Sequence, residues 1–167
     1  MTGASIIIRV DDKEVRRDFA RLQGLMKNTT PIMAAIGTGV VGSTQRRFTS
    51  QVAPDGSPWQ TLNPFYAAGK KNSRILTESG RLRDSISSSP SRDEVAIGTN
   101  VIYAAVHQFG AEIKPKNGTH LIFSINGRTV GAKSVTIPAR PFLGISADDE
   151  VMIAEVVFGF IKRHSRR

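Results

Sequence analysis

The stretch from Ile97 to Gly110 constrains the fold most, because it passes from strand to helix periodicity within a few residues. Val95 and Ile97 alternate with small or polar neighbours, which is typical of the end of a strand. Thr99 or Asn100 can cap a helix that follows, and Gly110 favours the positive φ that ends one. The residues that this short helix would carry are Val101, Ala104, Ala105, Gln108 and Phe109. We expect a strand, a tight turn and a short helix that displays Tyr103, His107 and Phe109.

A second segment, Ile137 to Gly144, is the expected counterpart of this stretch. Pro138 and Pro141 restrict its backbone and hold Arg140 between them, with Phe142 directly after. A guanidinium in such a place is expected to clamp a carboxylate or backbone carbonyl groups rather than to bind phosphate. We expect the two segments to form the heart of the fold.

Two helices are predicted in the first third of the chain. The apolar residues of the first recur at helical spacing after Asp11 and Asp12, and are Val15, Phe19, Leu22 and Met26. Thr30 and Pro31 favour the start of the second, which should run to about Gln51 and end with Arg46 and Arg47 near its negative pole. A short strand is expected before them, from Ser5 to Val10.

The second helix would contain Gly37, Gly39 and Gly42, each costing about 1 kcal/mol relative to alanine. Such residues allow another backbone to approach closely. We expect them to pack against a helix or sheet of the same chain, with a contact to a neighbouring subunit as the alternative.

A long irregular loop follows, at about residues 52–74. It contains a Pro54-Asp55-Gly56 turn signal and the only tryptophan of the chain. A loop of this length in a compact domain is functional or disordered. Either Trp59 holds the loop on the core, or the loop is an arm whose aromatic and basic residues dock on a partner. The other residues of this possible arm are Phe65, Tyr66, Lys70, Lys71 and Arg74.

The rest of the chain predicts short elements and a closing helix. Thr77 or Ser79 would cap a helix bearing Leu82 and Ile86, and two strands would follow at 85–89 and 94–98. Residues 111–116 are expected to be a charged connector. Asn126-Gly127 predicts a hairpin between 121–125 and a return strand that runs from 128 to 137, with a bulge at Gly131.

The closing helix should start near Ser146 and carry apolar residues on two sides. One side includes Val151 and Phe158, and the other includes Ile153 and Phe160. A helix apolar on two sides is expected to be buried on both, which suggests a subunit contact. A basic tail at 162–167 follows, and a solvated tail is its simplest interpretation.

Composition narrows the function classes. The 167 residues suit one domain, and the formal net charge of +9 favours an anionic partner, whether nucleic acid, an acidic protein surface or a lipid headgroup layer, unless the charge is simply solvated.

The absence of cysteine excludes disulfides, thiolate metal sites and a cysteine nucleophile in this sequence. No catalytic or metal-ligand spacing is present, so we expect no enzyme, cofactor or metal. No apolar run predicts a membrane span, no signal peptide is visible, and synthesis in the cytoplasm is expected.

An ordered set of short motifs resembles the tailed-bacteriophage virion morphogenesis, or tail-completion, family. The matching residues lie between about 40 and 150: Pro54 to Trp59, Ile75 to Leu82 with Ser85-Ile86, Ile97 to Asn100, Tyr103-Ala104, His107 to Gly110 and Ile137 to Gly144. The segment Thr77-Glu78-Ser79-Gly80 departs slightly from the family's usual Thr-Gly. The general pattern is similar to phage neck and tail-terminator proteins.

The resemblance implies a structural, non-enzymatic subunit of the virion. It would have an α+β fold, with a small, mostly antiparallel sheet packed against two or three helices and a loop arm, in one domain spanning residues 1–167. Six or twelve copies would form a ring at the head–tail junction or tail end, against neck, connector or tail-tube proteins, with a non-specific contact to DNA in the lumen as a further expectation. The alternative is a free basic DNA-binding protein acting in phage assembly. Our candidate interface residues are Trp59, Phe65, Tyr66, Lys70, Lys71, Arg74, Tyr103, His107, Phe109, Arg140, Phe142, Phe158 and Phe160.

Overall fold

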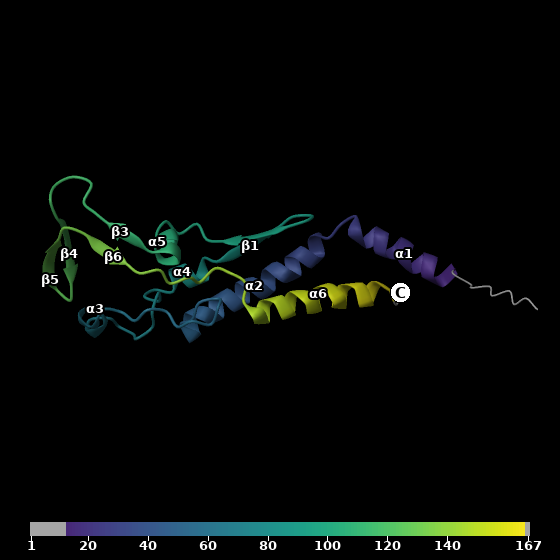
Figure 1. Cartoon of the computed structure of the whole chain (residues 1–167), viewed down its shortest axis with the longest axis horizontal. Helices are drawn as coiled ribbons and strands as arrows, with labels where there is room; N and C mark the ends of the chain where they lie inside the picture. Colours follow the sequence, from purple (N-terminus) through teal and green to yellow (C-terminus); the bar gives the residue numbers. More distant parts are fainter. Residues whose placement is uncertain (1–12, 166–167) are drawn as a thin grey trace, which may run out of the picture.

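The computed structural model describes residues 13–165, except for the side chains of Glu14, Val15, Asp18, Leu22, Leu25, Met26, His164 and Ser165. The predicted strand at 5–10 lies outside this range. Figure 1 shows an elongated α+β chain. Three long helices occupy one end: α1 (Lys13–Met26), α2 (Thr30–Ser50) and α6 (Ala147–Ser165). The other end holds most of the strands and the short helix α3 (Pro64–Ala68), so the two halves expose different surfaces.

Helix α2 is the central support. Pro31 lies in its first turn, where a missing N–H costs nothing, and Gln51 ends it with a left-handed φ of 60°. The cap position is Thr29 rather than the expected Thr30, and its side chain makes no capping hydrogen bond. None of the described helices is long and apolar enough to cross a membrane.

The glycines of α2 pack within the chain, as predicted. A Cβ on Gly37 would lie 2.8 Å from Val95 and 2.9 Å from Ser88, and one on Gly39 would lie 2.6 Å from Met152 of α6. The two positions therefore seat a hairpin and a helix against α2. Gly42 is different, because its nearest neighbour is Arg46 of the same helix, at 3.6 Å.

The described strands form three separate antiparallel pairs, not the single sheet that was expected. Strand β1 (Ser87–Pro90) pairs with β2 (Val95–Gly98), and β4 (Leu121–Ile125) pairs with β5 (Arg128–Ala132). The third pair joins β3 (Ala111–Ile113) to β6 (Val135–Ile137). The pairs stay apart because the first packs on α2, whereas the other two lie toward the far end of the molecule (Figure 1).

Three predictions for this region are wrong. The connector at 111–116 contains β3, and the return strand at 128–137 is two strands in different pairs. Gly131 lies directly opposite Ile122 in regular register, so it forms no bulge. The hairpin turn itself is confirmed, since Asn126 and Gly127 have φ values of 52° and 76°.

The short helices differ in length from the predicted ones. Asn63 caps α3, which the sequence interpretation missed, by accepting a hydrogen bond from the Phe65 N–H at 2.9 Å. Helix α4 (Arg81–Asp84) is one turn long and starts after Gly80, so Ile86 lies beyond it. Helix α5 (Ala104–Phe109) starts later than expected, and Gly110 ends it with a φ of 74°.

The core lies where the two predicted central segments meet. Phe142 is fully buried, and its ring centroid lies 5.4 Å from that of Phe48 on α2. Gln108 of α5 accepts hydrogen bonds from the N–H groups of Phe142 and Leu143 at 3.0 Å each, and donates to the Leu143 carbonyl at 3.0 Å. The two segments therefore do form the centre of the fold.

Candidate interaction surfaces

Three of the predicted interface residues are buried. Trp59 is 4% exposed, and its indole N–H donates to the Pro141 carbonyl at 2.8 Å. Phe142 lies beside it in the core, and Arg140 is also buried. Of the two interpretations of the 52–74 loop, the structure supports the one in which Trp59 holds the loop on the core. Trp59 and Phe142 are thus packing residues here, and not surface for a partner.

Lys70 is a fourth predicted interface residue that serves the fold. Its ammonium lies 2.9 Å from Glu78 and 3.0 Å from Asn72, and it also donates to the Thr77 carbonyl. Its side chain is 4% exposed. Lys71 and Arg74 are exposed beside it. The basic part of the loop therefore divides into one structural lysine and two cations available to a partner.

The remaining candidates lie on two surfaces. Phe65, Tyr66 and Tyr103 line a cavity at the strand end of the molecule, and Phe109 is 78% exposed near it. Phe158 and Phe160 are far from them along the chain, on α6.

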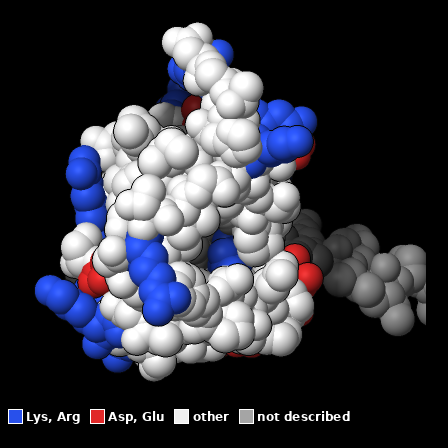
Figure 2. Space-filling model, turned by 90° about the vertical axis from the view of Figure 1, so that its left-hand side faces the viewer, with Lys and Arg blue, Asp and Glu red and all other residues white. Residues whose placement is uncertain are grey.

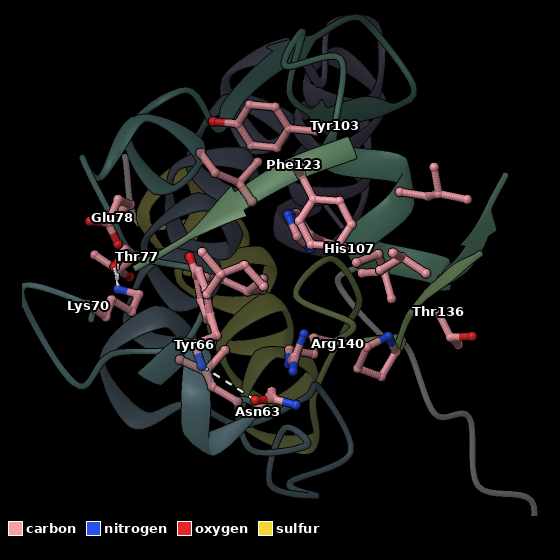
Figure 3. A pocket seen from close by; sticks show the side chains of 18 of the residues that line it. Asn63, Tyr66, Lys70, Thr77, Glu78, Tyr103, His107, Phe123, Thr136 and Arg140 are labelled. Carbon is pink, nitrogen blue, oxygen red and sulfur yellow. Dashed lines mark hydrogen bonds and ion pairs between the residues drawn. The ribbon is translucent and has the colours of Figure 1, made fainter. Parts of the chain in front are cut away.

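The cavity has a volume of about 1020 Å³ and lies between α3, α5 and the strand pairs β3–β6 and β4–β5. Most of its wall is apolar and aromatic, and Phe123 and Tyr103 project into it (Figure 3). Figure 2 views the molecule from this end and shows Lys and Arg side chains around the edge, with few Asp or Glu. The site is therefore an apolar hollow with a cationic border.

Arg140 supplies the charge inside this hollow. Its Nε donates to the Gln60 carbonyl at 2.8 Å and its Nη2 to the Thr61 carbonyl at 3.2 Å, so the expected backbone clamp is present. No carboxylate among the described residues pairs with it. Burial lowers the pKa of Arg140 below its ordinary value. The guanidinium thus faces the cavity with its charge uncompensated.

His107 lies beside Arg140 on the same wall (Figure 3). Its ring makes an edge contact with Tyr103, with centroids 5.9 Å apart, and its buried Nδ1 has no hydrogen-bond partner within the described part of the chain. Burial lowers the pKa of His107 from its ordinary value of 6.5, and the positive charge of Arg140 lowers it further. The imidazole is therefore neutral near pH 7, because burial opposes its protonation, which would also bring a second positive charge close to Arg140.

This shift predicts a stability that depends on pH. Below the ordinary pKa of 6.5 the unfolded state binds a proton at His107 that the folded state resists, so the free energy of unfolding should decrease as pH falls from about 7 to about 5. Urea titrations across this range should show a smaller decrease for His107→Gln. The matched control is His120→Gln, at an exposed histidine, which should keep the slope of the unchanged protein. Equal slopes for all three proteins would contradict the prediction.

The second surface is an apolar stripe along α6. Val151, Ala154, Phe158 and Ile161 recur at intervals of three and four residues, so they lie on one side of the helix, and all four are exposed. Phe158 is 69% exposed. The opposite side, with Ile153, Val156 and Phe160, is half-buried, and α6 contacts α2 and α1. The two apolar sides of α6 are thus as predicted, but only one is covered within this chain.

The sequence interpretation missed the residues that hold α6 in place. Arg47 of α2 is buried and donates to the carbonyls of Phe142 at 2.9 Å and Gly144 at 2.8 Å, and it forms an ion pair with the buried Asp149. Burial raises the pKa of Asp149, but hydrogen bonds from Ser43 and Ser146 and the charge of Arg47 outweigh this and lower it. An arginine on the apolar side of α2 was the available signal, and it was interpreted only as a cation at the helix end.

Among the described side chains, no cluster of three or more His, Asp and Glu is arranged to hold a metal ion.

Comparison with known proteins identifies the family. The model of the phage virion morphogenesis family matches residues 10–162, which is most of the chain. The chain belongs to this family. It is 29% identical to tail completion protein S of Escherichia phage P2 over 163 aligned residues. This alignment covers 90% of this chain and 99% of the relative. No solved structure matches the chain.

Two further relatives agree with this assignment. Putative capsid assembly protein G of Escherichia phage Mu is 27% identical over 87% of this chain and 92% of its own length. A Mu-like prophage G protein of Haemophilus influenzae is 28% identical over 86% of each chain. The family resemblance stated from short motifs is confirmed, and it extends beyond residues 40–150 to nearly the whole chain.

Proposed function

We propose that this virion morphogenesis protein is a structural subunit that completes the tail of a tailed phage. Copies of it form a ring at the tail end or the head–tail junction, against neck, connector or tail-tube proteins, and enable heads and tails to join. The family match and the name of the phage P2 relative support tail completion, whereas the phage Mu relative is named for capsid assembly. The observation that supports assembly is the pair of uncovered apolar surfaces, the cavity and the α6 stripe, in different halves of an elongated subunit.

This proposal places the protein in the finished particle and gives it no catalytic step. Exposed apolar surface of this kind is a feature of proteins that are completed by partners. The exposed cations Lys71 and Arg74 would face an acidic neighbour or DNA in the lumen, which would be held through its phosphates.

A phage that lacks this protein provides the test. We expect separate heads and tails in electron micrographs of lysates, restored to joined particles when the protein is supplied from a plasmid. The protein should also be detected by mass spectrometry in purified virions, in a small fixed number of copies. Normal joined particles without the protein, or its absence from finished virions, would contradict the proposal.

The net charge of +9 supports a second candidate, a free DNA-binding protein that acts in assembly. Burial of Arg140 withdraws one of these positive charges from the surface, whereas the pairs Arg47–Asp149 and Lys70–Glu78 are neutral and leave the net charge of the rest unchanged. A DNA-binding protein would bind duplex DNA as a monomer or dimer, with an affinity that falls by orders of magnitude as salt increases. The oligomeric state and the salt-dependent binding of DNA distinguish the two, and charge reversal at Lys71 and Arg74 tests the role of these cations. Assembly that keeps the same salt dependence after that change would count against a role of these cations in the ring.

A further inference from the structure

Arg140 has a charge that the described chain does not balance. A buried guanidinium without a carboxylate is costly, and hydrogen bonds to two carbonyl groups compensate only part of the lost hydration. The group faces a cavity that is open to a partner. A carboxylate brought into this cavity would therefore be held more strongly than one at an exposed cation.

The α6 stripe has the features that would complement this cavity. Glu150 and Glu155 lie at its two edges, because helical spacing places them on either side of Val151, Ala154 and Phe158. Both carboxylates are exposed, and neither forms an ion pair with another described residue. An apolar ridge bordered by acids is thus present on the same chain as an apolar hollow bordered by bases.

The unpaired charges at the border of the hollow have the matching sign, because the lining carboxylate Glu78 is neutralised by Lys70. Arg81 lines the cavity, and the guanidinium of Arg128 lies 5.9 Å from the ring centroid of Phe65 at its edge. The cavity volume of about 1020 Å³ is at the upper limit of ordinary ligand pockets, and would hold the side chains of one helix face.

We propose that the α6 stripe of one copy seats in the cavity of the next copy, with Glu155 directed toward Arg140. This contact rests on the proposed ring and specifies how its subunits meet. The two surfaces differ, so the contact is head-to-tail, and such contacts close into a ring when the rotation between neighbours permits. There are two competing arrangements. In one, α6 contacts α6 of a second copy, and in the other, the cavity holds part of another virion protein.

The absence of cysteine in the sequence makes a direct test available. Two single-cysteine variants are made, Ala154→Cys on the stripe, which keeps the Glu155 carboxylate, and Tyr66→Cys on the cavity wall. Both full-length variants are supplied together to the phage that lacks the protein, and the purified particles are oxidised. A disulfide forms only between Cα atoms within about 7 Å, so we expect a crosslinked dimer from the mixture and none from either variant alone. The matched control pairs Tyr66→Cys with Asp93→Cys, an exposed position in the β1–β2 turn, which should give no crosslink.

A second pair of variants checks the energetics. Phe158→Ser and Glu155→Lys change only exposed positions, so the circular dichroism spectrum of each variant should be that of the normally folded chain. Ring formation by each variant should fall at least about tenfold, which corresponds to a loss of about 1.4 kcal/mol per contact. Normal assembly of both variants would overturn the contact.

The crosslinking outcomes separate this contact from the proposed function. Rings that form without the mixed crosslink would overturn the contact and leave the ring proposal standing. A dimer from Ala154→Cys alone would show α6 against α6. A crosslink only to another phage protein would show a different occupant. Either result would overturn the contact. Particles that join without any ring of this protein would instead overturn the proposed function.

Discussion

Replacement of Arg47 by methionine is expected to lower the free energy of unfolding by about 3–5 kcal/mol, as measured by urea denaturation. The variant keeps a long apolar side chain but leaves the buried carboxylate of Asp149 without its cation. It also removes two hydrogen bonds to the backbone at Phe142 and Gly144. Loss of this one side chain therefore loosens α6 and the core segment together.

Arg46→Met is the matched control, because Arg46 is the exposed neighbour on the same helix and should change stability by no more than about 0.5 kcal/mol. Adding Asp149→Asn to Arg47→Met removes the unpaired charge and should recover part of the loss. Similar stabilities for Arg46→Met and Arg47→Met would show that the buried pair contributes little.

Replacement of Trp59 by alanine should also cost about 3–5 kcal/mol, the usual effect of emptying a buried aromatic site. Trp59 packs edge-on against Phe48, with ring centroids 5.5 Å apart, and it links the 52–74 loop to Pro141. We expect the variant to unfold at lower urea and the loop to become sensitive to limited proteolysis under native conditions.

Two controls separate packing from other roles of the loop. Trp59→Phe keeps most of the volume and loses the indole hydrogen bond, so it should cost only about 1 kcal/mol. Tyr66→Ala removes a half-exposed aromatic of the same loop and should leave stability nearly unchanged. If the loop of Trp59→Ala resists proteolysis as well as that of the unchanged protein, the anchoring role of Trp59 is wrong.

Features fixed by neighbouring residues were predictable from the sequence. The Asn126-Gly127 turn needs two residues that tolerate positive φ, and the chain supplies them between two apolar strands. The start of α6 is similar, since the Ser146 N–H donates to Asp149 at 2.9 Å and the Asp149 N–H donates back to Ser146 at 3.3 Å. Each depends on contacts within a few positions.

Features that depend on distant partners were not predictable in detail. Periodicity indicated strands but not which strands pair, so the connection between β3 and β6, across the intervening β4–β5 hairpin, was missed. The same limit applies to Trp59, because an aromatic loop residue has the same sequence signal whether it packs on the core or docks on a partner. The burial of Trp59 shows that it packs on the core, and the short distance between Arg47 and Asp149 shows that they are paired.

The segment from Ile137 to Gly144 joins the two halves of the subunit. At one end Ile137 pairs with Ala111 and Arg140 faces the cavity, and at the other Gly144 is held by Arg47 just before α6. Its two prolines and its hydrogen bonds to Gln108 leave little freedom between these points. The inclination of the stripe relative to the hollow is therefore the same in every copy, and in the assembly proposed above that inclination would determine the number of members around the circle.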